Sequence, residues 1–196
     1  MTTAQPTKIG IILGSTRPGR RGEAVAHWIV EQSAGYPSVV DGSVTVELLD
    51  VAAFDLSLLS EPTIPGAANR KYENPATRTW GAAIDALDGF IFVTPEYNHS
   101  VPAALKNAFD VIYPEWGHKA LGLVSYGADG GVRAVEHWRA IAANAHLMAV
   151  RGQVSLGLFT DWDGDTFTPS ERRDGELRSL FDHVVSVTNA LAPLRA

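Results

Sequence analysis

The stretch between residues 14 and 22 combines glycines, hydroxyl side chains and three arginines directly ahead of a predicted helix. It reads Gly-Ser-Thr-Arg-Pro-Gly-Arg-Arg-Gly, and its cations are Arg17, Arg20 and Arg21. Backbone N–H groups at a helix N-terminus form an anion site, and an arginine can bind a phosphate through two hydrogen bonds. A phosphomonoester carries about −1.5 to −2 charges near neutral pH. The stretch therefore predicts a phosphate-binding loop, with a solvated surface loop as the alternative.

The spacing of this loop argues against the two commonest nucleotide-binding motifs. Gly14 and Gly19 are too far apart for G-x-G-x-x-G. They match the Walker A spacing, but Arg20 and Arg21 occupy the positions that require Lys and Ser or Thr. Because the hydroxyl that binds magnesium is missing, ATP hydrolysis is disfavoured.

A second polar loop, residues 94–100, reads Thr-Pro-Glu-Tyr-Asn-His-Ser. Tyr97 offers a broad aromatic surface, and the Asn98 amide offers both donors and acceptors. These groups suit a flat heterocycle with imide-like edges. The alternative is a helix-entry turn, in which Ser100 is the N-cap and Pro102 lies in the first helical turn.

A third loop, residues 125–133, is rich in glycine, which permits close backbone approach. By itself it also fits a plain turn from a strand to a helix. Taken together, the three loops favour a phosphate at one end of a site and a planar ring at the other. Flavin mononucleotide (FMN) has that shape.

The elements that must position these loops are five short apolar runs that alternate with helical patterns. Apolar runs without polar alternation predict strands buried on both faces. The runs are Ile9–Leu13, Val44–Leu49, Phe90–Val93, Leu121–Val124 and Leu147–Leu158. We expect the last to bend at Gly152. Strands that alternate with helices predict a parallel sheet covered on both sides, in which ligands bind beyond the carboxyl ends of the strands.

The sequence does not settle the roles of two features that lie between these elements. Residues 53–76 form a long polar connection, which in a compact domain is usually functional or mobile; we expect it to form a wall over the ring or a subunit contact. Trp28 and Trp138 fall on apolar helical stripes. The other three tryptophans fit either a substrate mouth or core and subunit packing: Trp80, Trp116 and Trp162.

Length and composition predict an ordinary globular protein. The 196 residues predict a single domain, 1–196. A formal charge of −6 argues against a broad nucleic-acid footprint, and the absence of cysteine excludes disulfides and thiol catalysis. Residues 1–8 lack the apolar region of a signal peptide, and no apolar run has membrane-spanning length. We therefore expect a cytoplasmic protein without membrane insertion.

The three loops together resemble the NADPH-dependent FMN reductase family. The similarity covers Gly-Ser-Thr-Arg-Pro-Gly-Arg-Arg-Gly, the run Thr-Pro-Glu-Tyr-Asn-His-Ser-Val-Pro-Ala-Ala-Leu-Lys-Asn-Ala-Phe-Asp that ends at Asp110, and Ser-Tyr-Gly-Ala-Asp-Gly-Gly-Val-Arg-Ala. It extends from about Ile9 to Val150, and the Pro-Glu-Tyr-Asn stretch is its most specific part. The resemblance implies a three-layer, flavodoxin-like, doubly wound sheet of five parallel strands in the order 2-1-3-4-5, with FMN where the order reverses.

The resemblance also implies roles for particular residues. The phosphate would be held by the first loop and the start of the following helix, through Ser15, Arg17, Arg20, Arg21, Gly22 and Glu23. The isoalloxazine ring would be lined by the second loop, through Pro95, Glu96, Tyr97 and Asn98. Its other edge would meet Ser125, Tyr126 and Gly127. Many members carry Ser or Asn in the latter half of the phosphate loop, so the arginine that contacts the phosphate is left open.

The activity implied by the resemblance is hydride transfer from NADPH or NADH, through bound FMN, to a second acceptor in the same pocket. Candidate small-molecule acceptors are a quinone, free flavin, an azo compound or an oxidised metal anion. Since the flavin carries the chemistry, we assign no catalytic side chain. The resemblance further implies a homodimer or homotetramer whose cofactor sites lie near a subunit contact.

Two alternatives share the predicted fold. A flavodoxin-type electron carrier would dock protein partners without nicotinamide turnover, and the charge of −6 permits its acidic docking surface. Such carriers lack the long 53–76 segment. A flavin-free interaction domain would be colourless.

Two other groups of residues in the sequence resemble known sites only in part. Ser125, an aspartate at 161 or 163, and His183 follow the Ser-Asp-His order of a serine hydrolase, but Gly122 stands one position too early for G-x-S-x-G. The Asp-rich stretch 161–165 resembles a calcium loop but lacks its glycine and glutamate, so a polar turn is favoured. The six histidines show no ligand spacing, and we expect no metal site.

Overall fold

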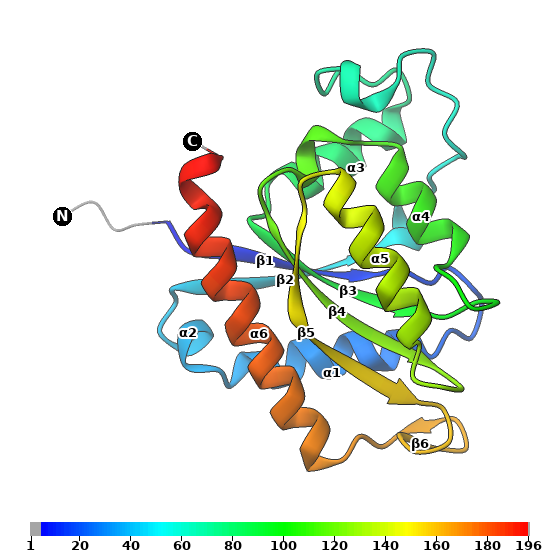
Figure 1. Cartoon of the computed structure of the whole chain (residues 1–196), viewed down its shortest axis with the longest axis vertical. Coiled ribbons are helices and arrows are strands. Elements are labelled where there is room, and N and C mark those ends of the chain that lie inside the picture. The colour runs from blue at the N-terminus through cyan, green and yellow to red at the C-terminus, as the bar shows by residue number, and fades with distance from the viewer. Residues whose placement is uncertain (1–4, 196) are drawn as a thin grey trace.

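A computed structural model describes residues 5–195 of the chain (Figure 1). Residues 1–4 and 196 lie outside the described residues. The predictions for the N-terminal stretch 1–8 and for the domain limits 1–196 fall partly on them. The central sheet has five parallel strands in the order β2-β1-β3-β4-β5, which confirms the flavodoxin-like order. The strands are β1 (Thr7–Leu13), β2 (Val44–Asp50), β3 (Gly89–Pro95), β4 (Ala120–Gly127) and β5 (Met148–Gly157).

Helices cover both faces of this sheet (Figure 1). Two of them, α1 (Gly22–Ala34) and α6 (Glu171–Leu191), bury apolar side chains in one core layer. The other layer is built by α3 (Pro75–Asp85), α4 (Ala103–Asp110) and α5 (Val132–Asn144). The smaller elements are α2 (Pro37–Val40), a hairpin of β6 (Trp162–Asp163) and β7 (Thr166–Phe167), and the 3-10 helices Val51–Phe54, Pro65–Ala67, Pro114–Trp116 and Ala192–Leu194.

The central strands are apolar because both of their faces are covered. Every residue of β3 and β4 is buried. Gly122 marks the close approach of α6, since a Cβ there would lie 2.8 Å from Val184 Cγ2. The edge strand β5 is irregular: Leu121 pairs with Ala149, but Leu123 pairs with Gln153. The expected bend near Gly152 is confirmed.

The start of α4 differs from the expectation. Ser100 is not its N-cap, because the helix begins at Ala103 and Pro102 occupies the cap position. Ser100 instead pairs with Tyr97 in an isolated bridge, and its hydroxyl lies 2.9 Å from His137 Nδ1. The two-residue turn between Tyr97 and Ser100 keeps Ser100 outside the helix.

Two of the three tryptophans whose role the sequence left undecided lie in the core. Trp80 and Trp116 are fully buried, so neither shapes a substrate mouth. Their indole N–H groups donate to the carbonyls of Ala108 (2.7 Å) and Phe109 (3.0 Å) in the last turn of α4. Free carbonyls at a helix end therefore satisfy the polar atoms that burial would otherwise leave unpaired.

The long 53–76 segment packs beside α3 and α4 (Figure 1). The Asn107 side chain of α4 holds it by accepting from Leu59 N–H and donating to the Ser57 carbonyl, both at 2.9 Å. None of its residues lines the cavity at the carboxyl edge that is described below. Its residues Asp55, Leu56 and Leu58 line a separate hollow together with Thr16 of the first loop. Both expected roles, the wall over the ring and the subunit contact, stay predictions.

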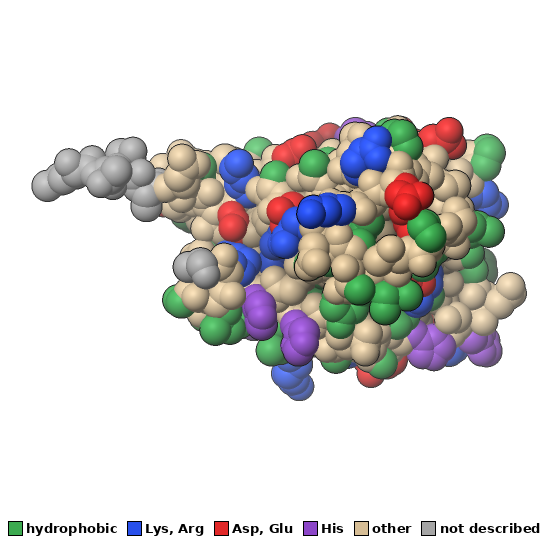
Figure 2. All heavy atoms as spheres, turned by 90° about the horizontal axis from the view of Figure 1, so that it is seen from above, with side chains coloured by type: hydrophobic (Ala, Val, Ile, Leu, Met, Phe, Trp, Pro, Cys, Tyr) green, Lys and Arg blue, Asp and Glu red, His purple; other side chains and the backbone are tan. Residues whose placement is uncertain are grey.

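The surface shows no broad basic face in the view of Figure 2, where basic, acidic and apolar side chains are interspersed. Among residues 5–195, no helix has both the length and the apolar character needed to cross a bilayer.

Replacing Trp116 tests its place in the core. Trp116→Ala removes a fully buried indole that stacks on Phe109 at a centroid distance of 5.0 Å, so we expect the free energy of unfolding to fall by about 3–5 kcal/mol. Val40→Ala is the control, because Val40 is 71% exposed and its loss should cost less than about 0.5 kcal/mol. Urea unfolding measures both, and equal stabilities would contradict the packing.

Candidate functional site

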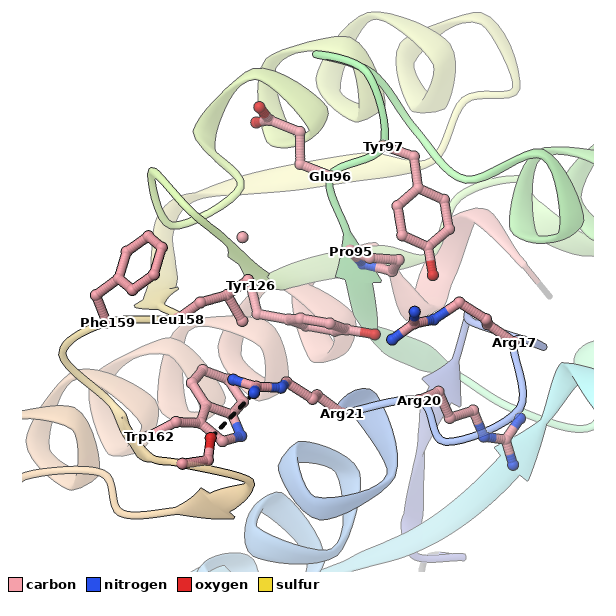
Figure 3. Close-up of a pocket in the computed structure, with 12 residues that line it drawn as sticks. Arg17, Arg20, Arg21, Pro95, Glu96, Tyr97, Tyr126, Leu158, Phe159 and Trp162 are labelled. Carbon is pink, nitrogen blue, oxygen red and sulfur yellow. Dashed lines mark hydrogen bonds between the residues drawn. The ribbon is translucent and has the colours of Figure 1, made fainter.

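A cavity of about 600 Å³ opens at the carboxyl edge of the sheet (Figure 3). This volume falls within the range of small-molecule sites. The cavity lies at the edge where β1 has β2 on one side and β3 on the other, which is the switch point of the sheet. Its lining comes from all three predicted loops and from a fourth segment after β5: Arg17, Arg20, Arg21, Pro95, Glu96, Tyr97, Tyr126, Gly127, Leu158, Phe159, Trp162 and Gly164.

Hydroxyl groups converge at the end of the cavity next to α1. The Ser15 hydroxyl, on a residue that is 1% exposed, lies 3.0 Å from the Tyr97 hydroxyl. The Tyr126 hydroxyl is buried and has no hydrogen-bond partner among the described residues. It reaches the first residue of α1 only because Gly22 lacks a side chain, since a Cβ there would lie 2.6 Å from it. Together these groups form a small cluster of donors at a helix N-terminus.

Burial keeps the Tyr126 hydroxyl protonated. Burial, the largest cause, and the nearby Tyr97 phenol raise the pKa of Tyr126 to about 12, although the neighbouring Ser15 hydroxyl and Arg17 charge act in the opposite direction. At neutral pH the hydroxyl therefore carries a proton that it can donate to an anion.

Arg20 lines the cavity, but its guanidinium turns away from it (Figure 3). It forms a two-pronged ion pair with Asp50 at the end of β2, and its Nη1 donates to the Ser15 carbonyl at 2.7 Å. The hydrogen bond with Asp50 raises the pKa of Arg20. Glu23, which is exposed, lies 3.8 Å from the same guanidinium. These contacts brace the first loop against β2.

The other two arginines of the loop behave differently. Arg21 donates to the Gly164 carbonyl at 3.0 Å and to Asp165 at 3.1 Å, and its guanidinium carbon lies 5.6 Å from the centre of the Trp162 ring. Within residues 5–195 the Arg17 side chain forms no ion pair and no hydrogen bond; its backbone N–H donates to the Ser15 hydroxyl at 3.5 Å. In Figure 3 its guanidinium points toward the hydroxyls of Tyr97 and Tyr126. Arg17 is thus the arginine of this loop whose charge is left for an anion.

The second loop forms another wall. Pro95 ends β3, and the Glu96 carboxylate accepts from the Arg133 backbone N–H at 3.0 Å and from Arg133 Nε at 2.6 Å. A tight turn follows, with φ of 50° at Asn98 and 65° at His99. Asn98 is exposed and does not line the cavity. The turn instead carries the Tyr97 ring over the cavity.

The third loop contributes the floor. Tyr126 and Gly127 line the cavity, whereas Ser125 is fully buried and donates its hydroxyl to the Gly130 carbonyl at 2.7 Å. Gly131 has a φ of 76°, and a Cβ there would lie 2.8 Å from Ser125 Cβ. Ser125 therefore stabilises the loop from behind.

A fourth segment, residues 158–164, completes the cavity; of its residues only Trp162 was considered for a substrate mouth from the sequence. It contributes Leu158, Phe159 and Trp162. Since β5 ends at the same edge as β1, β3 and β4, the topology alone could have identified it. The expected polar turn is the β6–β7 hairpin, with Gly164 at a φ of 60°. Trp162, 7% exposed, lies in the cavity wall.

Asp161 clamps the turn that leads into this segment. It is 2% exposed and accepts from Gly157 N–H (2.8 Å), the Thr160 hydroxyl (2.9 Å) and Arg173 Nε (2.9 Å). Burial alone would raise the pKa of Asp161, but the hydrogen bonds from Arg173, Gly157 and Thr160 outweigh it and lower the pKa. The carboxylate is thus a structural anion.

The residues of the hydrolase alternative do not assemble. The Ser125 hydroxyl and the Asp161 carboxylate are engaged as described, and His183 is exposed on α6 beside Gly152. Within the described range, no hydrogen bond joins the three residues, so this triad is not formed. The same residues, 5–195, contain no group of three or more His, Asp or Glu side chains that could hold a metal ion.

The sequence of this chain is similar to those of known proteins. The family described as NADPH-dependent FMN reductase matches residues 7–161. An NAD(P)H-dependent FMN reductase, ntnL of Nectria sp, is 38% identical over 65% of this chain and 63% of its own length. The chain therefore spans less than two thirds of that relative. The quinone reductase of Escherichia coli K12 is 28% identical over 79% of each chain.

A solved structure shows the same fold. FerB of Paracoccus denitrificans, a flavoenzyme NAD(P)H:(acceptor) oxidoreductase, superposes with a TM-score of 0.72 at 16% identity. The match covers 94% of this chain and 98% of FerB. At this identity the likeness concerns the fold alone.

The Asp161 clamp predicts a pH-dependent contribution to stability. Asp161→Asn should lower the free energy of unfolding by about 1–3 kcal/mol at pH 7, because it removes the buried charge that accepts from Gly157, Thr160 and Arg173, while Arg173 keeps Glu176 at 2.8 Å. The folded pKa lies below the ordinary value of 3.8, so the contribution is complete above that value and is lost as the pH falls through the folded pKa. The gap between wild type and variant should therefore narrow below about pH 4.

Urea unfolding between pH 7 and pH 3 measures this gap. Asp163→Asn, a change at an exposed residue of the same hairpin, serves as the control and should match wild type within about 0.5 kcal/mol. A gap between wild type and Asp161→Asn that stays constant with pH would contradict the clamp.

Proposed function

The chain belongs to the NADPH-dependent FMN reductase family, and from that premise we propose that it is an FMN-dependent oxidoreductase that uses NADPH or NADH. One observation carries the proposal. Ser15, Arg17 and Tyr126 converge at the N-terminus of α1, at one end of a cavity large enough for a planar ring.

The residues at this end fit a phosphate group. A buried hydroxyl without a partner, as on Tyr126, costs about 1–3 kcal/mol unless a ligand satisfies it. Arg17 supplies an unpaired positive charge, Ser15 a second hydroxyl, and Gly22 an open helix N-terminus. We propose that these four residues hold the FMN phosphate and that Arg20, with Glu23, positions the loop from behind.

The rest of the cavity fits a planar ring. Pro95, Tyr126 and Gly127 offer flat surfaces with little polarity, and Arg133 fixes Glu96 at the border of the site. FMN, when bound, would supply the two-electron chemistry by accepting a hydride from NADPH or NADH and passing it to an acceptor. The side chains would bind and orient the reactants and exclude water, so we assign none as an acid or base.

A quinone is the acceptor that the comparison with the quinone reductase of Escherichia coli supports. In that reaction the quinone gains a hydride and a proton and leaves as the hydroquinone, while the nicotinamide leaves oxidised. Free flavin, an azo compound and an oxidised metal anion are the other candidates.

We also propose that residues 1–196 form one domain that acts in the cytoplasm as a homodimer or homotetramer. The subunit contact is supported by the exposed apolar side chains of Leu58, Leu59 and Ile64 on the 53–76 segment. A chain without cysteine gains nothing from an oxidising compartment.

The test of this function is a visible spectrum of the purified protein with added FMN, followed by anaerobic titration with NADPH. We expect a bound flavin whose absorbance bleaches with stoichiometric NADPH and returns when a quinone is added. Bound flavin that neither NADPH nor NADH reduces would point to the electron-carrier alternative. A protein that does not bind FMN would refute both.

Replacing Arg17 tests the phosphate site. Arg17→Ala should weaken FMN binding by about 1–3 kcal/mol, which raises the dissociation constant about 5- to 150-fold. Arg151→Ala, at an exposed residue that does not line this cavity, should leave the constant unchanged. Titration of apoprotein into FMN, followed by flavin fluorescence, measures both. Equal affinities in the two variants would remove Arg17 from the site.

A further inference from the structure

Phe159 is an apolar side chain held in solvent at the rim of the cavity. It is 83% exposed and follows Leu158 directly after the end of β5. In Figure 3 it projects on the side of the cavity away from Arg17, beyond Leu158 and above Trp162. A phenyl ring that stays in water does not contribute the hydrophobic stabilisation that its burial would give. The exposure of Phe159 beside a ligand cavity therefore needs a physical explanation.

The exposure of Phe159 does not come from a loose loop. The turn that carries it is closed by hydrogen bonds to the Gly157 carbonyl from Thr160 N–H (3.1 Å) and from Asp161 N–H (2.9 Å). Leu158 N–H donates to the Gly127 carbonyl at 3.0 Å, and the Asp161 clamp holds the turn from below. The backbone on both sides of Phe159 is therefore fixed, so the turn itself holds the residue at the rim of the cavity.

The positive charges at the end of the cavity near Phe159 are paired with carboxylates. Arg21 is paired with Asp165 at 3.1 Å, and Arg133 is paired with both Glu96 and Asp129. The opposite end keeps the unpaired guanidinium of Arg17. An anion is therefore favoured at the Arg17 end, whereas the Phe159 end favours an uncharged, apolar group.

We propose that Phe159 is the platform of the acceptor subsite and that it selects planar, uncharged aromatic acceptors of the quinone class. This inference rests on the proposed function. The acceptor would lie at the rim, beside the space that Pro95, Tyr126 and Gly127 provide for the flavin ring, and would cover the Phe159 ring. Such an aromatic contact gains both from apolar burial and from ring geometry. Oxidised metal anions gain nothing from such a platform, so they would be poorer acceptors.

The test compares two acceptors of opposite character, menadione and ferricyanide, on the FMN-loaded enzyme. Phe159→Ala should raise the KM for menadione about 10-fold, the size expected when an aromatic contact is lost, and should leave ferricyanide reduction unchanged. Phe159→Tyr should restore the menadione KM, because it keeps the ring. Val40→Ala, which removes an apolar side chain that is 71% exposed elsewhere, should match wild type with both acceptors.

A binding measurement without turnover supplies an independent readout. Calorimetric titration of menadione into the FMN-loaded enzyme, without nicotinamide, should show the same loss of affinity in Phe159→Ala and its recovery in Phe159→Tyr. Unchanged menadione affinity in Phe159→Ala would overturn the subsite, as would a parallel loss with ferricyanide. A changed sedimentation coefficient with unchanged menadione kinetics would assign Phe159 to a subunit contact and would also overturn it.

The outcomes separate this inference from the proposed function. If Phe159→Ala binds FMN and is reduced by NADPH like wild type but keeps its menadione affinity, only the acceptor subsite is refuted. If wild-type protein fails to bind FMN, the proposed function and the subsite both fail.

Discussion

The parallel pairing of β1 with β2 on one side and β3 on the other is the constraint on which the site depends. Leu13 pairs with both Asp50 and Val93, so the strands end at one edge and the chain must leave that edge in opposite directions. The resulting gap holds the first loop and the N-terminus of α1. Because β4 and β5 run parallel to β3, their trailing loops arrive at the same edge, and four separate segments meet around one cavity.

The three arginines of the first loop show how a small set of like charges is divided by tertiary contacts. Arg20 is neutralised by Asp50 and braces the loop, and Arg21 ties it to the β6–β7 hairpin. Arg17 keeps its charge available. Three unpaired guanidinium groups in so short a loop would repel one another, whereas two paired groups and one free group give a stable loop with a directed positive charge. In a family whose chemistry belongs to a flavin, such positioning is what the protein has to supply.

Rigid supports lie behind each wall of the cavity. Glu96 is anchored by Arg133, Ser125 by the Gly130 carbonyl, and the turn before Trp162 by Asp161. These buried or half-buried bonds hold side chains such as Tyr97 and Phe159 in place without an apolar core around them. The cavity is therefore preformed at the ends of strands, and it gains its shape from the sheet rather than from flexible loops.

The amino-acid sequence by itself determined the strand runs, their parallel direction and the three loops at the carboxyl edge, because apolar periodicity and turn residues act locally. The strand order was implied only by the resemblance to a known family. The sequence did not reveal which arginine stays unpaired, since Asp50 and Asp165 are 30 and 144 residues away from their partners in the chain. It left Trp80 and Trp116 open, because their burial depends on carbonyls at the end of another helix. It missed Phe159 as part of the cavity and left Trp162 open between a substrate mouth and packing, since only the shared edge of the folded sheet brings the segment after β5 beside residues that lie more than a hundred positions earlier. Those choices are made by contacts between distant segments, which form only when the sheet is complete.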